Sequence, residues 1–223
     1  MPDVEHYIAV VASTQLLPVP LVPEVVLYAA ENAYDVWEIT RLGKNAEADE
    51  TETPVPYWSF PWAGGQALAR HLLDHPELVR GRRVLDLAAG SGLVAIAAMK
   101  AGASSAVAND VDPFAAAAQE LNARANHTNV EIMQRDVLDE TITSAQFDLV
   151  VAGDVCYERG LAERLEACLR RAKRNGAEVL LADPGRTYLP RERLDEVAIY
   201  DVPTSLQIEG VERKRTTLWT PRD

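Results

Sequence analysis

The sequence predicts an α/β fold, a Rossmann-like, doubly wound sheet of seven strands that is mostly parallel and ends in a C-terminal antiparallel hairpin. Seven β-rich runs are spaced along the chain, at 82–87, 105–109, 130–134, 147–152, 177–182, 196–202 and 211–219. Helix-prone segments follow several of the first five runs, as crossover connections between parallel strands require. The last two runs are joined by a short turn containing Gly210, which predicts the closing hairpin.

The remaining elements are predicted by composition and by proline. Ahead of the seven runs we expect a short helix, an extended connector, a strand and a polar, acidic loop, at 3–14, 18–23, 25–28 and 43–53. The connector is expected to be extended because its three prolines fix φ and lack a backbone donor. Helices of the main domain are predicted at 64–73, 93–100, 114–124 and 161–173. We therefore divide the chain into an N-terminal extension with an acidic loop, 1–54, and one domain, 55–223.

The turn after the first run indicates a ligand. Gly90 and Gly92 lead from a buried strand into an Ala-rich helix, which places bare backbone N–H groups beside a nucleotide-like molecule. Residues 90–95 fit G-x-G-x-x-A, a form of the dinucleotide-binding fingerprint. However, Asp86 ends the strand, and its carboxylate suits the ammonium of S-adenosylmethionine (SAM) better than a pyrophosphate. No mononucleotide-binding unit precedes the fingerprint, so SAM is favoured over a nicotinamide dinucleotide.

Acidic residues end four successive strands, namely Asp86, Asp110, Asp136 and Asp154. In open α/β sheets, ligands bind at the carboxyl ends of the strands. Asp110 lies eighteen residues after Gly92, where an acid can accept hydrogen bonds from both ribose hydroxyls of an adenosine. Asp136 is placed to accept a hydrogen bond from the adenine amino group. A single strand-end aspartate often only caps a helix, but four in phase predict a binding site.

Four aromatic side chains and two prolines are packed into the segment 56–62, just before the first helix of the domain. One interpretation is that this segment crosses the mouth of the cofactor site, with Trp62 close to the ligand. The other is that it is a hydrophobic lid, fixed by proline and packed on the core. The sequence leaves both open.

Several segments together carry a specific resemblance. The chain resembles the class I, seven-β-strand SAM-dependent methyltransferases, and within them the electron transfer flavoprotein β-subunit lysine methyltransferase family. The matching segments are 16–24, 56–66, 108–113, 153–158 and 183–186. Related protein-lysine methyltransferases share an Asp/Glu-x-x-Tyr motif after the fourth strand, which maps onto Asp154 and Tyr157.

The resemblance implies SAM as cofactor and a protein lysine as methyl acceptor, with the electron transfer flavoprotein β subunit as favoured substrate. Asp154 and Tyr157 are the expected catalytic residues, which would hold the target amine. The expected cofactor-binding residues are Trp62, Asp86, Gly90, Gly92, Asp110 and Asp136. A ribosomal protein lysine, a small molecule or a nucleic acid base is an alternative target. The Asp-Pro-Pro-Tyr or Asn-Pro-Pro-Tyr signature of base-methylating enzymes is absent at 154–157. A SAM-binding partner protein without catalysis is the alternative outside the enzymes.

Charge favours a protein partner over nucleic acid. The chain has 22 basic and 34 acidic residues, for a net charge of −12. A phosphate backbone needs a basic footprint, whereas a lysine-bearing protein is attracted to an acidic enzyme. The plainer explanation for the acidic balance is solubility. No apolar run approaches the length of a membrane span.

The two cysteines, Cys156 and Cys168, are too few for a disulfide framework and fit a reducing compartment. Animal members of the family are mitochondrial, whereas the acidic start of this chain lacks transit-peptide character. We therefore expect a bacterial, cytoplasmic protein. His71 and His75 are expected to be ordinary helix-surface residues, because nothing near them completes a metal site.

Overall fold

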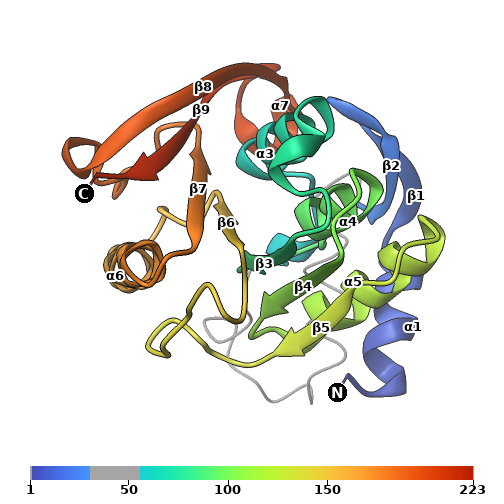
Figure 1. Cartoon of the computed structure of the whole chain (residues 1–223). Coiled ribbons are helices and arrows are strands. Elements are labelled where there is room, and N and C mark those ends of the chain that lie inside the picture. The colour runs from blue at the N-terminus through green and yellow to red at the C-terminus, as the bar shows by residue number, and fades with distance from the viewer. Residues whose placement is uncertain (1, 31–55, 223) are drawn as a thin grey trace.

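The structure, a computed structural model, describes residues 2–30 and 56–222 (Figure 1). The acidic loop expected at 43–53 and the boundary expected at residue 54 lie outside these residues. Within the described residues, the helices are too short or too polar to cross a bilayer.

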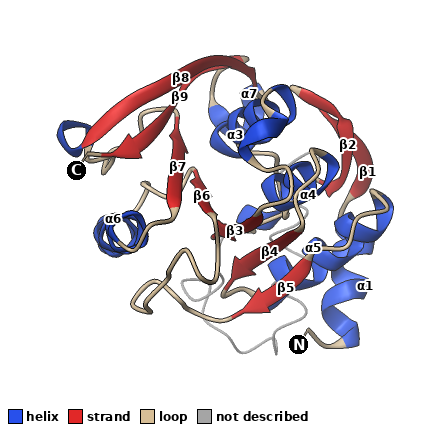
Figure 2. Ribbon diagram, viewed as in Figure 1, coloured by secondary structure: helices blue, strands red, loops and turns tan. Residues whose placement is uncertain are grey.

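A seven-stranded sheet forms the centre of the molecule, in the order β5-β4-β3-β6-β7-β9-β8 (Figure 2). Its strands are β3 Arg83–Leu87, β4 Ser105–Asp110, β5 Glu131–Gln134, β6 Leu149–Gly153, β7 Glu178–Asp183, β8 Leu194–Pro203 and β9 Arg213–Pro221. The pairs among β3 to β7 are parallel, and β9 lies antiparallel to both β7 and β8. The predicted parallel sheet with a closing hairpin is therefore confirmed. Chain order reverses between β3 and β6, the position at which such sheets bind ligands.

Helices cover both faces of this sheet. They are α3 Ala63–Asp74, α4 Leu93–Lys100, α5 Pro113–Ala125 and α6 Arg159–Arg174. Figure 1 shows α6 on one side, and α3, α4 and α5 on the other. Each face of the sheet has its own hydrophobic core. Successive side chains of β3 enter the two cores in turn, because successive side chains of a strand point to opposite faces. Leu85 packs in the cluster that includes α6, and Val84 in the cluster that includes α3 and α4.

The N-terminal extension matches the prediction in part. The helix expected at 3–14 is α1 Val4–Ser13, and the strand expected at 25–28 lies within β2 Val22–Ala29. The extended connector differs, because most of it pairs in a two-stranded sheet of β1 Gln15–Val19 and β2. Pro18 lies within β1, next to an irregularity in the register. A two-stranded sheet has only edge strands, which tolerate proline, so the prolines did not prevent pairing.

This hairpin packs on helices of the domain. Its apolar side chains share a buried cluster with Ile96 and Ala97 of α4. Two asparagines of α5 also hold the backbone of β2: Asn122 Oδ1 accepts from Tyr28 N at 2.7 Å, and Asn126 Oδ1 accepts from Val26 N at 3.0 Å. The extension is thus joined to the domain by both packing and hydrogen bonds.

Short helices complete the described part of the chain. They include the 3₁₀ helices η2 Tyr57–Ser59, η3 Pro76–Leu78 and η4 Arg191–Arg193. The connection between β8 and β9, predicted as a short turn, contains the one-turn helix α7 Leu206–Glu209. Gly210 ends α7 with a φ of 73°, a conformation that favours glycine.

Candidate active site

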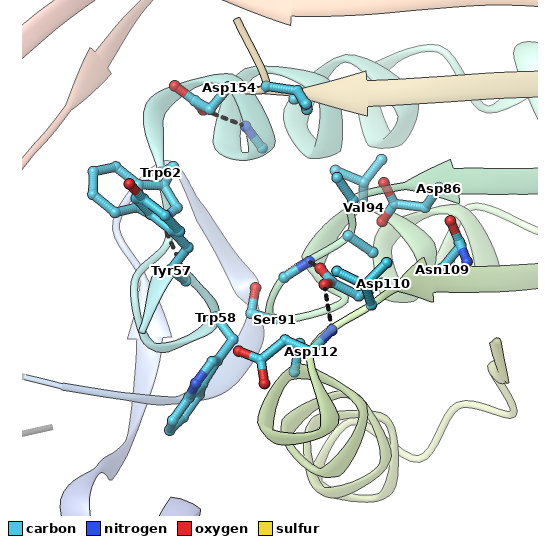
Figure 3. Close-up of a pocket in the computed structure, with 18 of the residues that line it drawn as sticks. Tyr57, Trp58, Trp62, Asp86, Ser91, Val94, Asn109, Asp110, Asp112 and Asp154 are labelled. Atoms are coloured by element: carbon cyan, nitrogen blue, oxygen red, sulfur yellow. Dashed lines mark hydrogen bonds between the residues drawn. The ribbon is translucent and has the colours of Figure 1, made fainter. Parts of the chain in front are cut away.

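A cavity of about 510 Å³ opens at the carboxyl ends of the central strands. Of the eight residues predicted for the site, seven line it: Trp62, Asp86, Gly90, Asp110, Asp136, Asp154 and Tyr157. Figure 3 shows Tyr57 and Trp62 on one side of this space, with Asp86 and Asp110 across from them. The predicted residues are therefore brought together, although they come from segments far apart in the sequence.

Gly92 is the exception, because it supports the cavity from behind. Its φ of 78° turns the chain into α4, and a Cβ there would lie 3.2 Å from Cγ of Gln119. Gly90 passes beneath η2 with a φ of 51°, a conformation that favours glycine, and a Cβ there would lie in ordinary contact with Trp58 Cα, at 3.6 Å. Ala88 also has a φ of 51°, a strained value for a residue with a side chain.

Asp86 is a buried carboxylate with little to stabilise its charge. It is 2% exposed, and its Oδ2 accepts a hydrogen bond of 3.1 Å from Ala95 N at the start of α4. Burial raises the pKa of Asp86 to about 8. No basic side chain of residues 2–30 and 56–222 forms an ion pair with it. The site is therefore suited to a ligand that brings a positive charge.

Asp110 is held by backbone donors on both of its oxygens. Oδ2 accepts from Gly90 N at 2.9 Å, and Oδ1 accepts from Asp112 N at 3.1 Å. Each carboxylate oxygen has a second lone pair, so the group retains capacity for two ligand hydroxyls. Burial raises its pKa. The geometry suits the ribose contact expected from the sequence.

Asp136 reaches the cavity, but protein donors engage its carboxylate. Oδ1 accepts from Leu138 N at 3.0 Å, and Oδ2 pairs with Arg164 at 2.9 Å. These two donors hold the pKa of Asp136 below its usual range. A contact with adenine would have to share the carboxylate with Arg164, a partner that the sequence did not indicate.

Asp154 binds the first turn of α3. It is buried with a φ of 60°, and its Oδ2 accepts from the backbone N–H groups of Gly64 and Gly65. A Cβ on Gly64 would lie 2.5 Å from this oxygen, so glycine is required there. Oδ1 pairs with Arg186 Nη2 at 2.8 Å. Burial raises the pKa of Asp154 to about 6, with Arg186 acting in the opposite direction.

Aromatic rings form the mouth of the cavity beside Asp154. Tyr57 and Tyr157 lie with ring centroids 4.8 Å apart, and Trp62 Nε1 donates to the carbonyl of Tyr57 at 2.7 Å. By contrast, Trp58 is 1% exposed and stacks on Phe114, in a core cluster below. Trp58 thus packs in the core and also borders the cavity, as the lid interpretation expects, whereas Trp62 lines the cavity at its mouth. The contact of Trp62 with a ligand stays a prediction.

Sequence reasoning missed Arg186 as the partner of Asp154. Residues 183–186 carried part of the resemblance, but no local pattern connects an arginine after the fifth strand with an acid after the fourth. Glu209 was also missed. Glu209 lies on α7, and its Oε1 atom pairs with Nη2 of Arg186 at 3.1 Å. The side chain of Glu209 is 5% exposed. Only the folded sheet brings these residues together.

His71 was predicted on the surface and is instead buried. β8 and β9 pack against α3, and the Nδ1 atom of His71 lies 2.9 Å from the hydroxyl of Tyr200 in β8. His75 does lie at the surface end of the helix, half exposed. Among the described residues, no cluster of His, Cys, Asp and Glu has the form of a metal site.

Comparisons with known proteins agree with this geometry. Residues 68–169 match the model of the ribosomal protein L11 methyltransferase (PrmA) family. The chain is 40% identical over 170 residues to the electron transfer flavoprotein beta subunit lysine methyltransferase of Rattus norvegicus, in a match that covers 74% of this chain and 66% of that protein. It is 38% identical over 210 residues to the Xenopus laevis protein of the same name, covering 90% and 80%. The match thus spans about two thirds of the rat relative's length and more of the frog's.

A solved structure supports the fold. Magnesium protoporphyrin IX methyltransferase from Synechocystis PCC 6803, with bound SAM, superimposes with a TM-score of 0.52 at 15% identity, over 71% of this chain and 78% of that one. The two relatives named above are animal proteins and give no support to the expected bacterial source. With a frog relative matched over nine tenths of the chain, the protein belongs to the electron transfer flavoprotein β-subunit lysine methyltransferase family.

Proposed function

We propose that the protein is a SAM-dependent protein-lysine N-methyltransferase, and that its substrate is the electron transfer flavoprotein β subunit. One observation carries the proposal: a single cavity is lined by the buried acids Asp86 and Asp110 and, beside its aromatic mouth, by Asp154 and Tyr157. A cofactor and an acceptor side chain can meet in such a space. The names of the rat and frog relatives give the substrate.

The residues present fit SAM. The ammonium of its methionine part would neutralise the carboxylate of Asp86, whose pKa of about 8 reflects burial without a cation. Asp110 would accept from the ribose, and the bare turn at Gly90 lets the ligand approach the backbone. When bound, SAM supplies an activated methyl group: the amine lone pair forms the nitrogen–carbon bond while the carbon–sulfur bond breaks and leaves its electron pair on sulfur.

The chain's own task is to present a neutral amine. A lysine ammonium has a pKa of about 10.4 and must release a proton to water before it can attack. The rings of Tyr57, Trp62 and Tyr157 would exclude water from the lysine stem, which favours the uncharged form. Asp154 would orient the amine through the lone pairs that its present partners leave. Asp154 thus serves orientation, because a carboxylate alone raises the pKa of a nearby lysine.

Two further features belong to the proposal. A net charge of −12 favours encounters with a lysine-rich surface. Both cysteines are free and buried, which agrees with a reducing, cytoplasmic location. The match to the ribosomal protein L11 methyltransferase family supports one second candidate, a lysine of a ribosomal protein.

The direct test is methyl transfer from radiolabelled SAM to purified electron transfer flavoprotein and, separately, to ribosomal protein L11. We expect label on the flavoprotein β subunit, with loss of transfer in Asp154→Ala and SAM affinity within several-fold of the wild type by calorimetry. Label on L11 alone would overturn the substrate. SAM binding without label on either protein or on a cell extract would contradict protein methylation.

A further inference from the structure

Buried acids and partly buried cations form a network beside the aromatic mouth, and each comes from a different segment of the chain. Arg186 Nη2 lies 2.8 Å from Oδ1 of Asp154 and 3.1 Å from Oε1 of Glu209. Glu209 of α7 also pairs with Lys214 of β9. The guanidinium of Arg186 lies 5.4 Å from the ring centroid of Trp62, so the cation is held at the edge of the cavity. Arg186 is thus the cation that the cavity places against Asp154.

Each cation of the network is paired with an acid. Asp183 at the end of β7 also lies beside Arg186, from whose backbone N–H it accepts a hydrogen bond of 2.6 Å, and burial raises the pKa of Asp183. Burial likewise raises the pKa of Cys156 and that of Tyr157 to about 12, so both groups are neutral at pH 7. In the ion pairs themselves, two carboxylates, on Asp154 and Glu209, face two cations, on Arg186 and Lys214.

This balance matters because of the chemistry proposed above, on which the inference rests. An opposite charge within about 4–6 Å raises the pKa of a lysine by about 1–3 units. An unpaired Asp154 would therefore hold the target lysine as an ammonium, which has no lone pair for methyl transfer. A neutralised Asp154 still accepts a hydrogen bond from the amine but opposes deprotonation far less.

We propose that Arg186 is a positioning residue that offsets the charge of Asp154, so that the target lysine loses its proton to water beside Tyr157. Arg186 acts through Asp154 and does not itself touch the methyl group. Glu209 holds the guanidinium from the other side and sets how much positive charge remains at the mouth.

The test is the pH dependence of kcat, whose acidic limb reports groups in the enzyme–substrate complex. In Arg186→Gln the acidic limb should move upward by about one pH unit or more, because one positive charge is lost. In Arg186→Lys it should stay close to the wild-type position.

Glu209→Gln provides an opposite test that is independent of whether Arg186→Gln folds. Removing this negative charge leaves the mouth more positive, so the acidic limb should move downward. Thermal melting and SAM calorimetry on each variant report folding and cofactor binding separately from activity. If kcat falls in the Arg186 and Glu209 variants but the acidic limb of the pH profile keeps its wild-type position, Arg186 has only a structural role and the inference is overturned. A wild-type enzyme that methylates no lysine at any pH would instead overturn the proposed function.

Discussion

The backbone N–H of Gly90 donates a 2.9 Å hydrogen bond to the carboxylate of Asp110, which joins the turn after β3 to the end of β4. One side chain thus shapes the glycine turn and also faces the cavity that the turn borders. Loss of this carboxylate would affect the ligand directly and through the backbone. We therefore expect a substitution of Asp110 to weaken cofactor binding by both routes.

Asp110→Asn should therefore weaken SAM binding on the order of 100-fold, because hydrogen bonds to a charged acceptor contribute about 1.5–3 kcal/mol each. Calorimetric titration measures the change. Asp195→Asn is the matched control, since Asp195 is exposed on β8 and pairs only with Arg222 among the ion pairs of the described residues. Equal affinity in the Asp110 variant and the wild type would remove the ribose contact from the proposal.

The raised pKa of Asp86 predicts that the affinity for SAM depends on pH. With a pKa of about 8 in the free protein, the carboxyl is largely protonated at pH 6 and must release its proton when a ligand ammonium arrives. SAM affinity should therefore rise as pH increases from 6 to 8 and level off above that. Titrations in buffers of different ionisation enthalpy would show proton release, which Asp86→Asn should abolish.

The buried carboxylate of Asp86 is also expected to lower the free energy of unfolding at high pH. The pKa of Asp86 is 3.8 when unfolded and about 8 when folded, so the folded state binds more protons between these values. Its contribution to stability is present at low pH and is lost as pH rises through 8. Asp86→Asn should therefore raise the free energy of unfolding at pH 8, by on the order of 2 kcal/mol or more. Denaturant unfolding at pH 5 and pH 8 checks the sign, because the gain should shrink at pH 5.

Two adjacent glycines of α3 should respond differently to alanine. A Cβ on Gly64 would lie 2.5 Å from Asp154 Oδ2 and 2.6 Å from the carbonyl of Ala182, so Gly64→Ala should lower the free energy of unfolding by about 2 kcal/mol or more. A Cβ on Gly65 meets only Leu93 Cδ2, at 3.8 Å, and Gly65→Ala should change stability by less than about 1 kcal/mol. Denaturant unfolding of both variants makes the comparison, and equal effects would contradict the close packing of α3 on Asp154.

The aromatic segment offers a second matched pair. Trp58→Ala should cost about 3–5 kcal/mol in the free energy of unfolding, because Trp58 is fully buried against Phe114. Trp62→Ala should leave the protein folded and raise the SAM dissociation constant roughly 10-fold or more, because its ring lines the cavity. Thermal melts run beside titrations separate the two. A Trp62 variant that unfolds like the Trp58 variant would make Trp62 structural as well.

Features that depend on local sequence were predicted correctly, and features that depend on contacts between distant segments were not. The strands of the large sheet begin and end within two residues of their predicted positions, because most of the parallel strands are short apolar runs bounded by turn residues and the last two are β-rich runs on either side of a turn. The acids at strand ends followed from the same periodicity. The N-terminal hairpin was missed, since proline predicts an extended chain and not its pairing partner. The exposure of His71 was wrong because the strand that covers it lies far along the chain.

The partners of Asp154 show the same limit within the site. The Asp/Glu-x-x-Tyr motif identified the residue, but its ion pair with Arg186 and its hold on Gly64 depend on three elements meeting in space. The local sequence around Asp154 does not indicate these contacts with distant segments. Charge balance in the site was therefore beyond the reach of motif analysis, although it bears directly on the chemistry.

The hairpin of β1 and β2 has a consequence for how the protein unfolds. Asn122 and Asn126 lie on α5, and their side chains complete the hydrogen bonds of a strand nearly one hundred residues earlier. Without that strand, Ile96 and Ala97 of α4 would face water directly behind the glycine turn. We therefore expect the extension and the domain to unfold as one cooperative unit, and a fragment without the extension to lose the support behind its glycine turn.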